Sequence, residues 1–265
     1  SVKDPLWKYK WVEKNEPEVF KKTHKWLDVK EYLIARATGR FIMTPDSAYA
    51  TFLYDTRKGR EGWSKVLCDT FGVNRNHLPN IIKATDIVGG LSKEAARDLG
   101  LVGGTPVFGG GGDATLIGIG AGAVNVGETH IYSGTSGWVS TILDRQVVDI
   151  EAMIASVVAL EADRFNYFAE METAGKSLEW VKDHLALDEI GIYLEKKDIT
   201  CDKEKLYTSL YDYLTETITK AVPGSGGVIF TPWLHGNRCP FEDPNAAGMF
   251  FNIRLETGKT ELIRA

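Results

Sequence analysis

Apolar residues recur three and four positions apart through much of the first hundred residues, which is the period of an amphipathic helix. Residues 18–27 follow this period, and residues 29–39 continue it up to a glycine, a common residue at helix ends. A shorter segment, 92–99, begins with a serine of the helix-capping type and stops before Gly100. The pattern therefore predicts helices over 18–27, 29–39 and 92–99.

A glycine-rich run interrupts this pattern. The β-favouring residues 106–108 lead into four glycines, 109–112, followed by Asp113 and a helix-like stretch over 114–126. Gly118, Gly120 and Gly122 make that stretch thin. We expect these three glycines to allow close packing against a neighbouring element, and we prefer this explanation to ligand contact.

After Gly127 the pattern becomes one of alternating strands and turns. Residues 128–133 and 138–142 are predicted to form two strands around a tight turn at 134–137. Further strands are expected within 147–160, at 166–170 and at 249–253, the last after a turn at 243–248, and helices over 173–185 and 202–221. The chain is thus predicted to be an α/β protein with one domain over 1–126 and a second over 127–265.

Composition excludes several classes of protein. The 265 residues are 43% hydrophobic and 25% charged, as expected for a globular protein, and the net charge of -5 disfavours a general nucleic-acid binder. Cys68, Cys201 and Cys239 lie far apart, which indicates neither a zinc site nor a disulfide scaffold and fits a reducing cytoplasm. The longest apolar run, 153–160, is too short for a membrane span, and no secretory segment opens the chain.

Asp113 is the first candidate for chemistry. Glycines let the backbone approach a ligand closely, and the dipole of a helix keeps a carboxylate at its first turn ionised. An ionised, fixed carboxylate at the mouth of a glycine-lined cleft is a suitable general base. From these residues alone, a helix-capping role explains Asp113 equally well.

Two later loops also hold polar groups at close spacing. The turn Gly134-Thr135-Ser136 offers successive amides and two hydroxyls, which suit an anion, although hairpin turns are often built this way. Arg238 could pair with phosphate, but a surface or structural salt bridge is the commoner role for a lone arginine. His235 is better explained as a loop or packing histidine than as a catalyst. The sequence has no Walker A or Gly-x-Gly-x-x-Gly pattern, and no Ser/His/Asp set emerges.

The order of these segments resembles that of the FGGY family of carbohydrate kinases, almost from end to end. Three residues depart from the usual family pattern: Lys3, Asn237 and Asn252. The matching segments are the Lys-x-x-Trp motif at 8–11, the stretches 30–39 and 44–55, the glycines and aspartate at 110–113, the Gly-Thr-Ser turn at 134–136, the loop at 232–248 and the end of the chain at 248–265.

The resemblance implies an actin-like fold of two ribonuclease-H-like domains with the active site between them. The family's first phosphate hairpin, Asp-x-Gly-Thr, and its adenosine motif, Gly-Gly-Gly-Ala-x-Ser, are not found in this sequence. We therefore expect an internal piece of a longer protein, with each domain only partly present. Residues 1–126 would belong to the sugar-binding domain I and 127–265 to the ATP-binding domain II, and this piece alone would be inactive.

The activity that the resemblance implies is transfer of the γ-phosphoryl group of ATP, with Mg²⁺, to a primary hydroxyl of a ketose or polyol. Asp113 would be the catalytic base, and Gly134, Thr135 and Ser136 would lie along the ATP phosphates. Gly236 would bring backbone near the nucleotide. Xylulose is the first candidate acceptor, although Ala114 replaces the Asn or Gln frequent in xylulose kinases. The expected partners are the acceptor and ATP or ADP, and neither nucleic acid nor a membrane is expected. The expected location is the cytoplasm. A homodimer is an allowed assembly.

Two other classes of protein remain as alternatives. One is a catalytically silent relative that binds a sugar or nucleotide, against which the presence of Asp113 and of the Gly-Thr-Ser turn argues. The other is an actin-like ATPase without a sugar substrate. The Lys-x-x-Trp segment and the loop at 232–236 favour the sugar kinase over this ATPase.

Overall fold

The computed structural model describes residues 4–185, 191–193, 195–196 and 203–265, and for 203–210 it describes the backbone. Lys3, Cys201 and Asp202, the first residue of the helix expected at 202–221, lie outside the described residues. The chain divides into two compact units. Unit 1 comprises 1–130, 140–148 and 155–168, and unit 2 comprises 131–139, 149–154 and 169–265.

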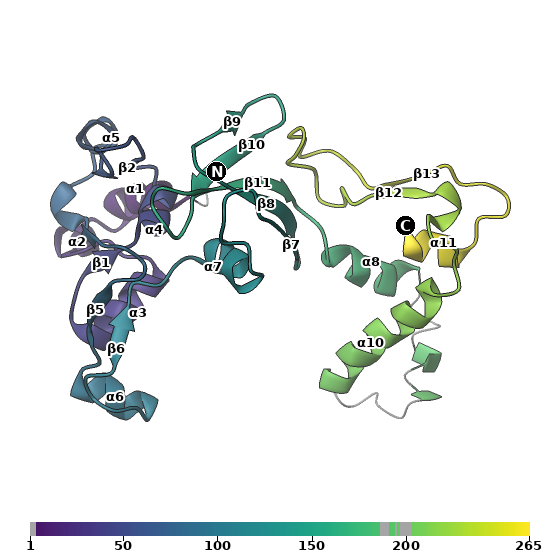
Figure 1. Cartoon of the computed structure of the whole chain (residues 1–265), viewed down its shortest axis with the longest axis horizontal. Coiled ribbons are helices and arrows are strands. Elements are labelled where there is room, and N and C mark those ends of the chain that lie inside the picture. Colours follow the sequence, from purple (N-terminus) through teal and green to yellow (C-terminus); the bar gives the residue numbers. More distant parts are fainter. Residues whose placement is uncertain (1–3, 186–190, 194, 197–202) are drawn as a thin grey trace. The chain divides into compact units, whose positions relative to one another are not determined.

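Unit 1 begins with short helices and two-stranded sheets (Figure 1). Its strands pair as β1 with β4 in parallel, and as β2 with β3 and β5 with β6 in antiparallel fashion. The helices are α1 (Pro5–Asn15), α2 (Pro17–Lys21), α3 (Val29–Thr38), α4 (Pro45–Ala50), α5 (Lys65–Phe71), η1 (Arg75–His77), α6 (Lys93–Leu99) and α7 (Asp113–Gly120). The strands are β1 (Ile42–Met43), β2 (Tyr54–Asp55), β3 (Gly62–Trp63), β4 (Asn80–Ile81), β5 (Ile87–Gly90) and β6 (Pro106–Phe108).

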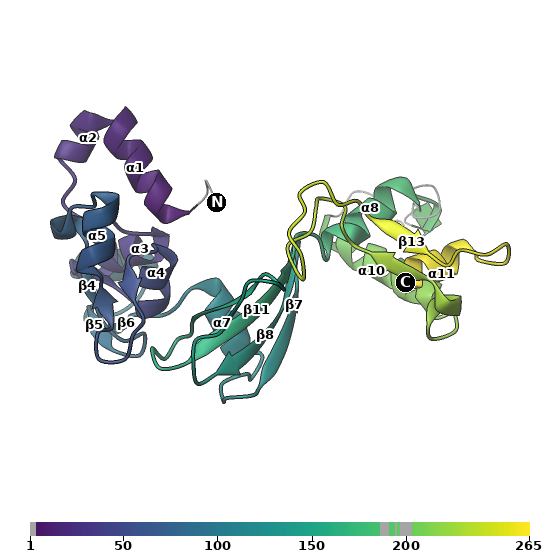
Figure 2. The same cartoon turned by 90° about the horizontal axis from the view of Figure 1, so that it is seen from above.

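A five-stranded sheet follows, with its strands in the order β7-β8-β11-β10-β9. Strands β10 and β11 are antiparallel, with Ala155 opposite Phe168 and Val158 opposite Phe165. Figure 2 shows α7 beside β8 and β11. The strands are β7 (Thr129–Ser133), β8 (Gly137–Leu143), β9 (Val148–Asp149), β10 (Ile154–Val158) and β11 (Phe165–Met171).

The later part of unit 2 contains helices and a two-stranded antiparallel sheet. Val181 and Leu214 are its buried centre, and Trp180, Tyr213 and Ile263 pack against them. Within the described part of the chain, each helix is too short or too polar to span a bilayer. The elements are α8 (Lys176–His184), α10 (Lys203–Ile218), η2 (Ser225–Gly227), β12 (Ile229–Thr231), β13 (Met249–Phe251) and α11 (Lys259–Arg264).

Helices α3 and α6 confirm the two sequence predictions that rested on end signals. The Asp28 carboxylate accepts a hydrogen bond from Val29 N (2.8 Å), and Ser92 Oγ accepts one from Ala95 N (3.1 Å). Gly39 and Gly100 end the two helices with φ of 72° and 68°, a left-handed conformation that favours glycine. Both ends of these helices are therefore set by local residues.

The helix predicted over 18–27 is wrong beyond Lys21, where α2 ends. The residues that follow bond to the η1 turn: Trp26 N donates to His77 O (2.7 Å), and Lys25 Nζ donates to Leu78 O (2.9 Å). These contacts, about fifty residues apart in sequence, hold 23–28 out of a helix. A tertiary interaction thus overrides the apolar period.

The helix predicted over 114–126 also proves shorter, since α7 ends at Gly120. Gly122 takes a φ of 86°, and the Glu128 carboxylate accepts hydrogen bonds from the amides of Val124 and Asn125, both at 2.7 Å. The Asn125 side chain and these two amides lower the pKa of Glu128. A carboxylate-capped turn therefore replaces the last part of the expected helix.

The close-packing role expected for the helix glycines holds at Gly118. A Cβ at Gly118 would lie 2.8 Å from His130 Cε1, whereas a Cβ at Gly120 would meet nothing within 4 Å. We predict that Gly118→Ala lowers the free energy of unfolding by about 1–3 kcal/mol through overpacking.

The matched control is Gly120→Ala, on the same helix and with open space around it. We expect it to be neutral or stabilising by up to about 1 kcal/mol, because alanine has the higher helix propensity. Chemical denaturation of both variants measures the difference. Equal stabilities of the two variants would show that the His130 contact carries no packing constraint.

Candidate active site

Asp113 is the first residue of α7 and is exposed to solvent. Gly112, in extended conformation, is the N-cap residue, and Asp113 Oδ1 accepts a hydrogen bond from Ala114 N (2.8 Å). The helix dipole stabilises a negative charge at this position. One carboxylate oxygen is thus held by the helix start, and the side chain is accessible to a reacting group.

The glycines before Asp113 lie against the chain's own backbone. Gly109 N donates to Asp86 O (3.1 Å) and Gly110 N to Ala84 O (2.9 Å). A Cβ at Gly109 would lie 2.9 Å from Lys83 O, and Gly110 has a φ of 64°. Close packing and a left-handed turn therefore account for glycine at these two positions without a ligand.

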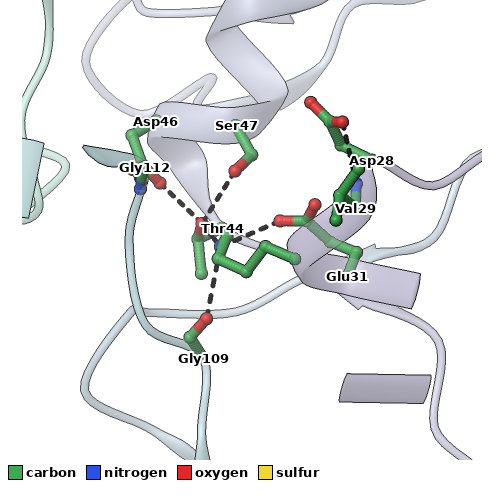
Figure 3. Close-up of polar contacts among 9 residues, drawn as sticks. Asp28, Val29, Glu31, Thr44, Asp46, Ser47, Gly109 and Gly112 are labelled. Carbon is green, nitrogen blue, oxygen red and sulfur yellow. Dashed lines mark hydrogen bonds and ion pairs between the residues drawn. The ribbon is translucent and has the colours of Figure 1, made fainter. Parts of the chain in front are cut away.

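A polar cluster from α3 and from the start of α4 contacts this glycine loop (Figure 3). Lys30 Nζ donates to Thr44 Oγ1 (2.6 Å) and to Gly109 O (3.2 Å). Thr44 Oγ1 donates to Asp46 Oδ1 (2.5 Å), and Gly112 N donates to Asp46 Oδ2 (2.6 Å). The cluster therefore connects both ends of the loop.

Glu31 completes the cluster as a fully buried carboxylate. Its Oε1 forms an ion pair with Lys30 Nζ (2.8 Å), and its Oε2 has no hydrogen-bond partner among the described residues. Lys30, Glu31, Thr44 and Asp46 lie in the family-like stretches 30–39 and 44–55, but no sequence pattern assigned any of them a role. The sequence did contain one signal for such a cluster: Lys30 and Glu31 are adjacent charged residues in a segment, 29–39, whose apolar period predicts a helix packed against the core.

In unit 2 the Gly134-Thr135-Ser136 turn joins β7 to β8, as the sequence predicted. Gly134 N donates to Ser136 O (2.9 Å). The carbonyls of the turn face the beginning of α8: Gly134 O accepts from Gly175 N (2.6 Å), and Thr135 O accepts from Ala174 N (3.0 Å). The turn is therefore fixed through its carbonyl groups.

The amides and hydroxyls of Thr135 and Ser136 donate to no acceptor within the described part of the chain. These four donors belong to successive residues of one fixed turn. Such a turn suits an anion with several oxygens, for example a phosphate group. The donors expected from the sequence for a phosphate site are thus present and uncommitted.

The loop around Gly236 is built on the turn that follows it. Gly236 is buried, has a φ of 79°, and a Cβ there would lie 3.0 Å from Asp243 O. Asn237 N donates to Asp243 O (2.9 Å), and Asp243 N donates to Asn237 O (3.0 Å). The predicted turn at 243–248 is confirmed, with Asp243 Oδ1 accepting from Asn245 N (2.8 Å).

Arg238 takes the salt-bridge role rather than pairing with a free anion. Its guanidinium contacts the carboxylate of Glu170, and its Nε lies 2.5 Å from Glu172 Oε1. Glu170 belongs to β11 and Glu172 follows it. The two carboxylates therefore fasten the 232–240 loop to the end of that strand.

A hollow of about 460 Å³ lies in unit 2 between α8 and this loop. Thr135 and His235 both line it, so the structure brings the predicted phosphate turn and the residue next to Gly236 to one space. His235 is an exposed loop residue, as expected. Other lining residues are Glu172, Thr173, Lys176, Trp180 and Leu234.

No group of three or more His, Cys, Asp or Glu side chains placed to hold a metal ion occurs among the described residues. These residues therefore supply no ready-made protein cage for Mg²⁺. A magnesium ion that binds chiefly through nucleotide phosphates needs one or two carboxylates rather than such a cage.

Comparison with known proteins gives matches over nearly the whole chain. Residues 2–120 match the N-terminal domain, and residues 130–265 the C-terminal domain, of the FGGY family of carbohydrate kinases. The gluconokinase of Bacillus subtilis (strain 168) is 29% identical over 261 residues, which are 98% of this chain and 48% of that protein. The xylulose kinase of Escherichia coli (strain K12) is 28% identical over 255 residues, 96% of this chain and 48% of that protein.

A solved structure of a xylulose kinase from Lactobacillus acidophilus resembles the fold with a TM-score of 0.77 at 25% identity. The likeness covers 99% of this chain and 49% of that one. The predicted α/β, actin-like and ribonuclease-H-like fold class is confirmed by this likeness. The chain spans about half the length of the curated relatives it matches.

Proposed function

Because the chain belongs to the FGGY family of carbohydrate kinases, we propose that the full-length protein carrying it transfers the γ-phosphoryl group of ATP to a hydroxyl of a small sugar, sugar acid or polyol. The observation that carries this proposal is an exposed carboxylate, Asp113, at the first residue of a helix behind an anchored glycine loop. Such a side chain is fixed in place and open to an incoming hydroxyl.

Asp113 acts as the general base. As the acceptor oxygen bonds to the γ-phosphorus, the bond from that phosphorus to the β–γ bridging oxygen breaks and ADP leaves. The proton of the acceptor hydroxyl passes to Asp113, most directly to Oδ2, because Oδ1 is bonded to Ala114 N. The carboxylate then returns the proton to water.

The turn Gly134-Thr135-Ser136 binds the ATP phosphates. The uncommitted amides and hydroxyls of Thr135 and Ser136 support this role, because charge-assisted hydrogen bonds to phosphate are strong. Gly236 brings backbone near the nucleotide, with Thr135 and His235 lining the same hollow. Mg²⁺ would neutralise charge on the phosphates when bound, and no step assigned to these residues depends on it.

The acceptors that we propose to test first are taken from the substrates named for the matching kinases. Xylulose kinases and gluconokinases both match this chain at similar identity, 28% and 29%. We therefore take D-xylulose and D-gluconate as the first acceptors to test. The small Ala114 beside Asp113 is compatible with an acceptor other than xylulose.

The division of labour between the two parts of the chain belongs to the same proposal. Residues 1–126 form part of the sugar-binding domain I, and 127–265 form part of the ATP-binding domain II.

A cytoplasmic location is supported by the scattered cysteines, of which Cys68 is fully buried as a free thiol.

The test is a substrate panel with the full-length protein. ADP release is followed with ATP alone and with ATP plus D-xylulose, D-gluconate or glycerol. We expect ADP only when an accepted sugar or polyol is present. Equal ADP release without any acceptor, unchanged by Asp113→Ala, would favour the ATPase alternative and reject the kinase.

A further inference from the structure

One side chain holds the last residue of the glycine loop. Asp46 Oδ2 accepts a hydrogen bond from Gly112 N at 2.6 Å, across 66 positions of sequence. Gly112 directly precedes Asp113 and is the N-cap residue of α7. Asp46 is only 9% exposed, so water competes little for this bond.

The other oxygen of Asp46 belongs to a closed ring of contacts. Asp46 Oδ1 accepts from Thr44 Oγ1, which accepts from Lys30 Nζ, which in turn donates to Gly109 O (Figure 3). Gly109 and Gly112 are the first and last glycines of the loop. The ring therefore fixes both ends of the segment that leads to Asp113.

The Asp46 carboxylate directs both of its oxygens to groups outside the backbone of its own helix. Asp46 lies in the first turn of α4, whose N-cap residue, Thr44, makes no capping bond with its side chain. Both carboxylate oxygens are instead bonded to Thr44 Oγ1 and Gly112 N. The buried Glu31 balances Lys30, which keeps a cation available to orient Thr44.

We propose that Asp46 is a positioning residue for Asp113, and that Lys30 and Thr44 orient Asp46 for this task. The inference rests on the proposed function, in which Asp113 is the base. Asp46 contacts no reacting group and acts through the backbone of Gly112. A displaced Gly112 moves the Asp113 carboxylate away from the acceptor hydroxyl, and a misplacement of about 1 Å can lower a rate by about 10²-fold.

The variant Asp46→Asn tests this role in the full-length protein. Asparagine keeps the size of the side chain but replaces one accepting oxygen by an amino group. The amino group cannot accept from Gly112 N; if it faces Thr44 instead, a neutral hydrogen bond replaces the stronger one to a carboxylate. We expect kcat to fall about 10-fold, while KM for ATP and for the acceptor stays within about 3-fold of wild type, since no binding group is removed.

The matched control is Asp86→Asn. Asp86 also borders the loop, but its exposed carboxylate accepts from Lys83 N (3.1 Å), and only its main-chain oxygen contacts Gly109. We expect its kcat to remain within about 2-fold of wild type. Thr44→Val is the second variant if Asp46→Asn folds poorly, and it should lower kcat by about 3-fold through loss of the Thr44 bridge.

Hydrogen exchange of a peptide covering 109–116 provides a readout independent of turnover. Exchange should be faster in Asp46→Asn than in wild type, and unchanged in Asp86→Asn. If the wild type is active and Asp46→Asn has the same kcat, the positioning role of Asp46 is wrong, but the proposed function still stands. A wild type that phosphorylates no acceptor would instead overturn the proposed function.

Discussion

Asp113→Asn lowers kcat for phosphoryl transfer by about 10³-fold in the full-length protein, because the amide cannot accept the hydroxyl proton. The same variant should unfold at nearly the wild-type temperature. Asparagine Oδ1 can still accept the hydrogen bond from Ala114 N that Asp113 makes (2.8 Å). Steady-state kinetics and a thermal melt on one preparation measure both quantities.

This pair of measurements separates catalysis from helix capping, the two roles that the sequence left open for Asp113. A capping residue would show the reverse behaviour: nearly full activity in Asp113→Asn and a clear loss of stability in Asp113→Ala. Asp98→Asn is a suitable control, because Asp98 is an exposed carboxylate that pairs with its neighbour Arg97. It should leave kcat within about 2-fold of wild type.

Gly175→Ala should raise KM for ATP by about 10- to 100-fold and destabilise the protein by about 1–3 kcal/mol. A Cβ at Gly175 would lie 2.6 Å from Gly134 O, a backbone atom that cannot move without shifting the Gly134-Thr135-Ser136 turn. Gly175 has φ -60° and ψ -24°, which alanine adopts freely. The effect therefore comes from the contact and not from backbone strain.

Gly120→Ala serves as the control for the same change in a site with no neighbour within 4 Å. Nucleotide titrations and thermal melts of both variants, at a saturating acceptor concentration, measure the two effects. If Gly175→Ala kept the wild-type KM for ATP, the turn Gly134-Thr135-Ser136 would not be part of the nucleotide site, even if the variant were less stable.

The elements that sequence predicted well are those whose ends depend on neighbouring residues. Helices α3 and α6 carry their own caps, Asp28 and Ser92, and their own terminal glycines. The helix predicted over 18–27 was too long, because Lys25 and Trp26 bond to a turn about fifty residues later in the sequence. No local pattern contains that information.

The same distinction holds for the candidate site. The order of the motifs identified Asp113 and the Gly134-Thr135-Ser136 turn as candidates, and their roles stay predictions. The partners of Arg238 lie 66 and 68 positions away, and the partner of Gly112 lies 66 positions away. Glycines 109 and 110 suggested ligand approach, but the structure shows them packed and turned against the chain's own backbone.

The fate of the γ-phosphoryl group distinguishes a sugar kinase from an ATPase. The full-length protein is incubated with γ-labelled ATP and either D-xylulose or D-gluconate, and the labelled products are separated. For a sugar kinase we expect a labelled phosphate ester of one acceptor in an amount equal to the ADP formed, and almost none with Asp113→Asn. Label that appears only as inorganic phosphate, with either acceptor present, would contradict the proposed kinase activity.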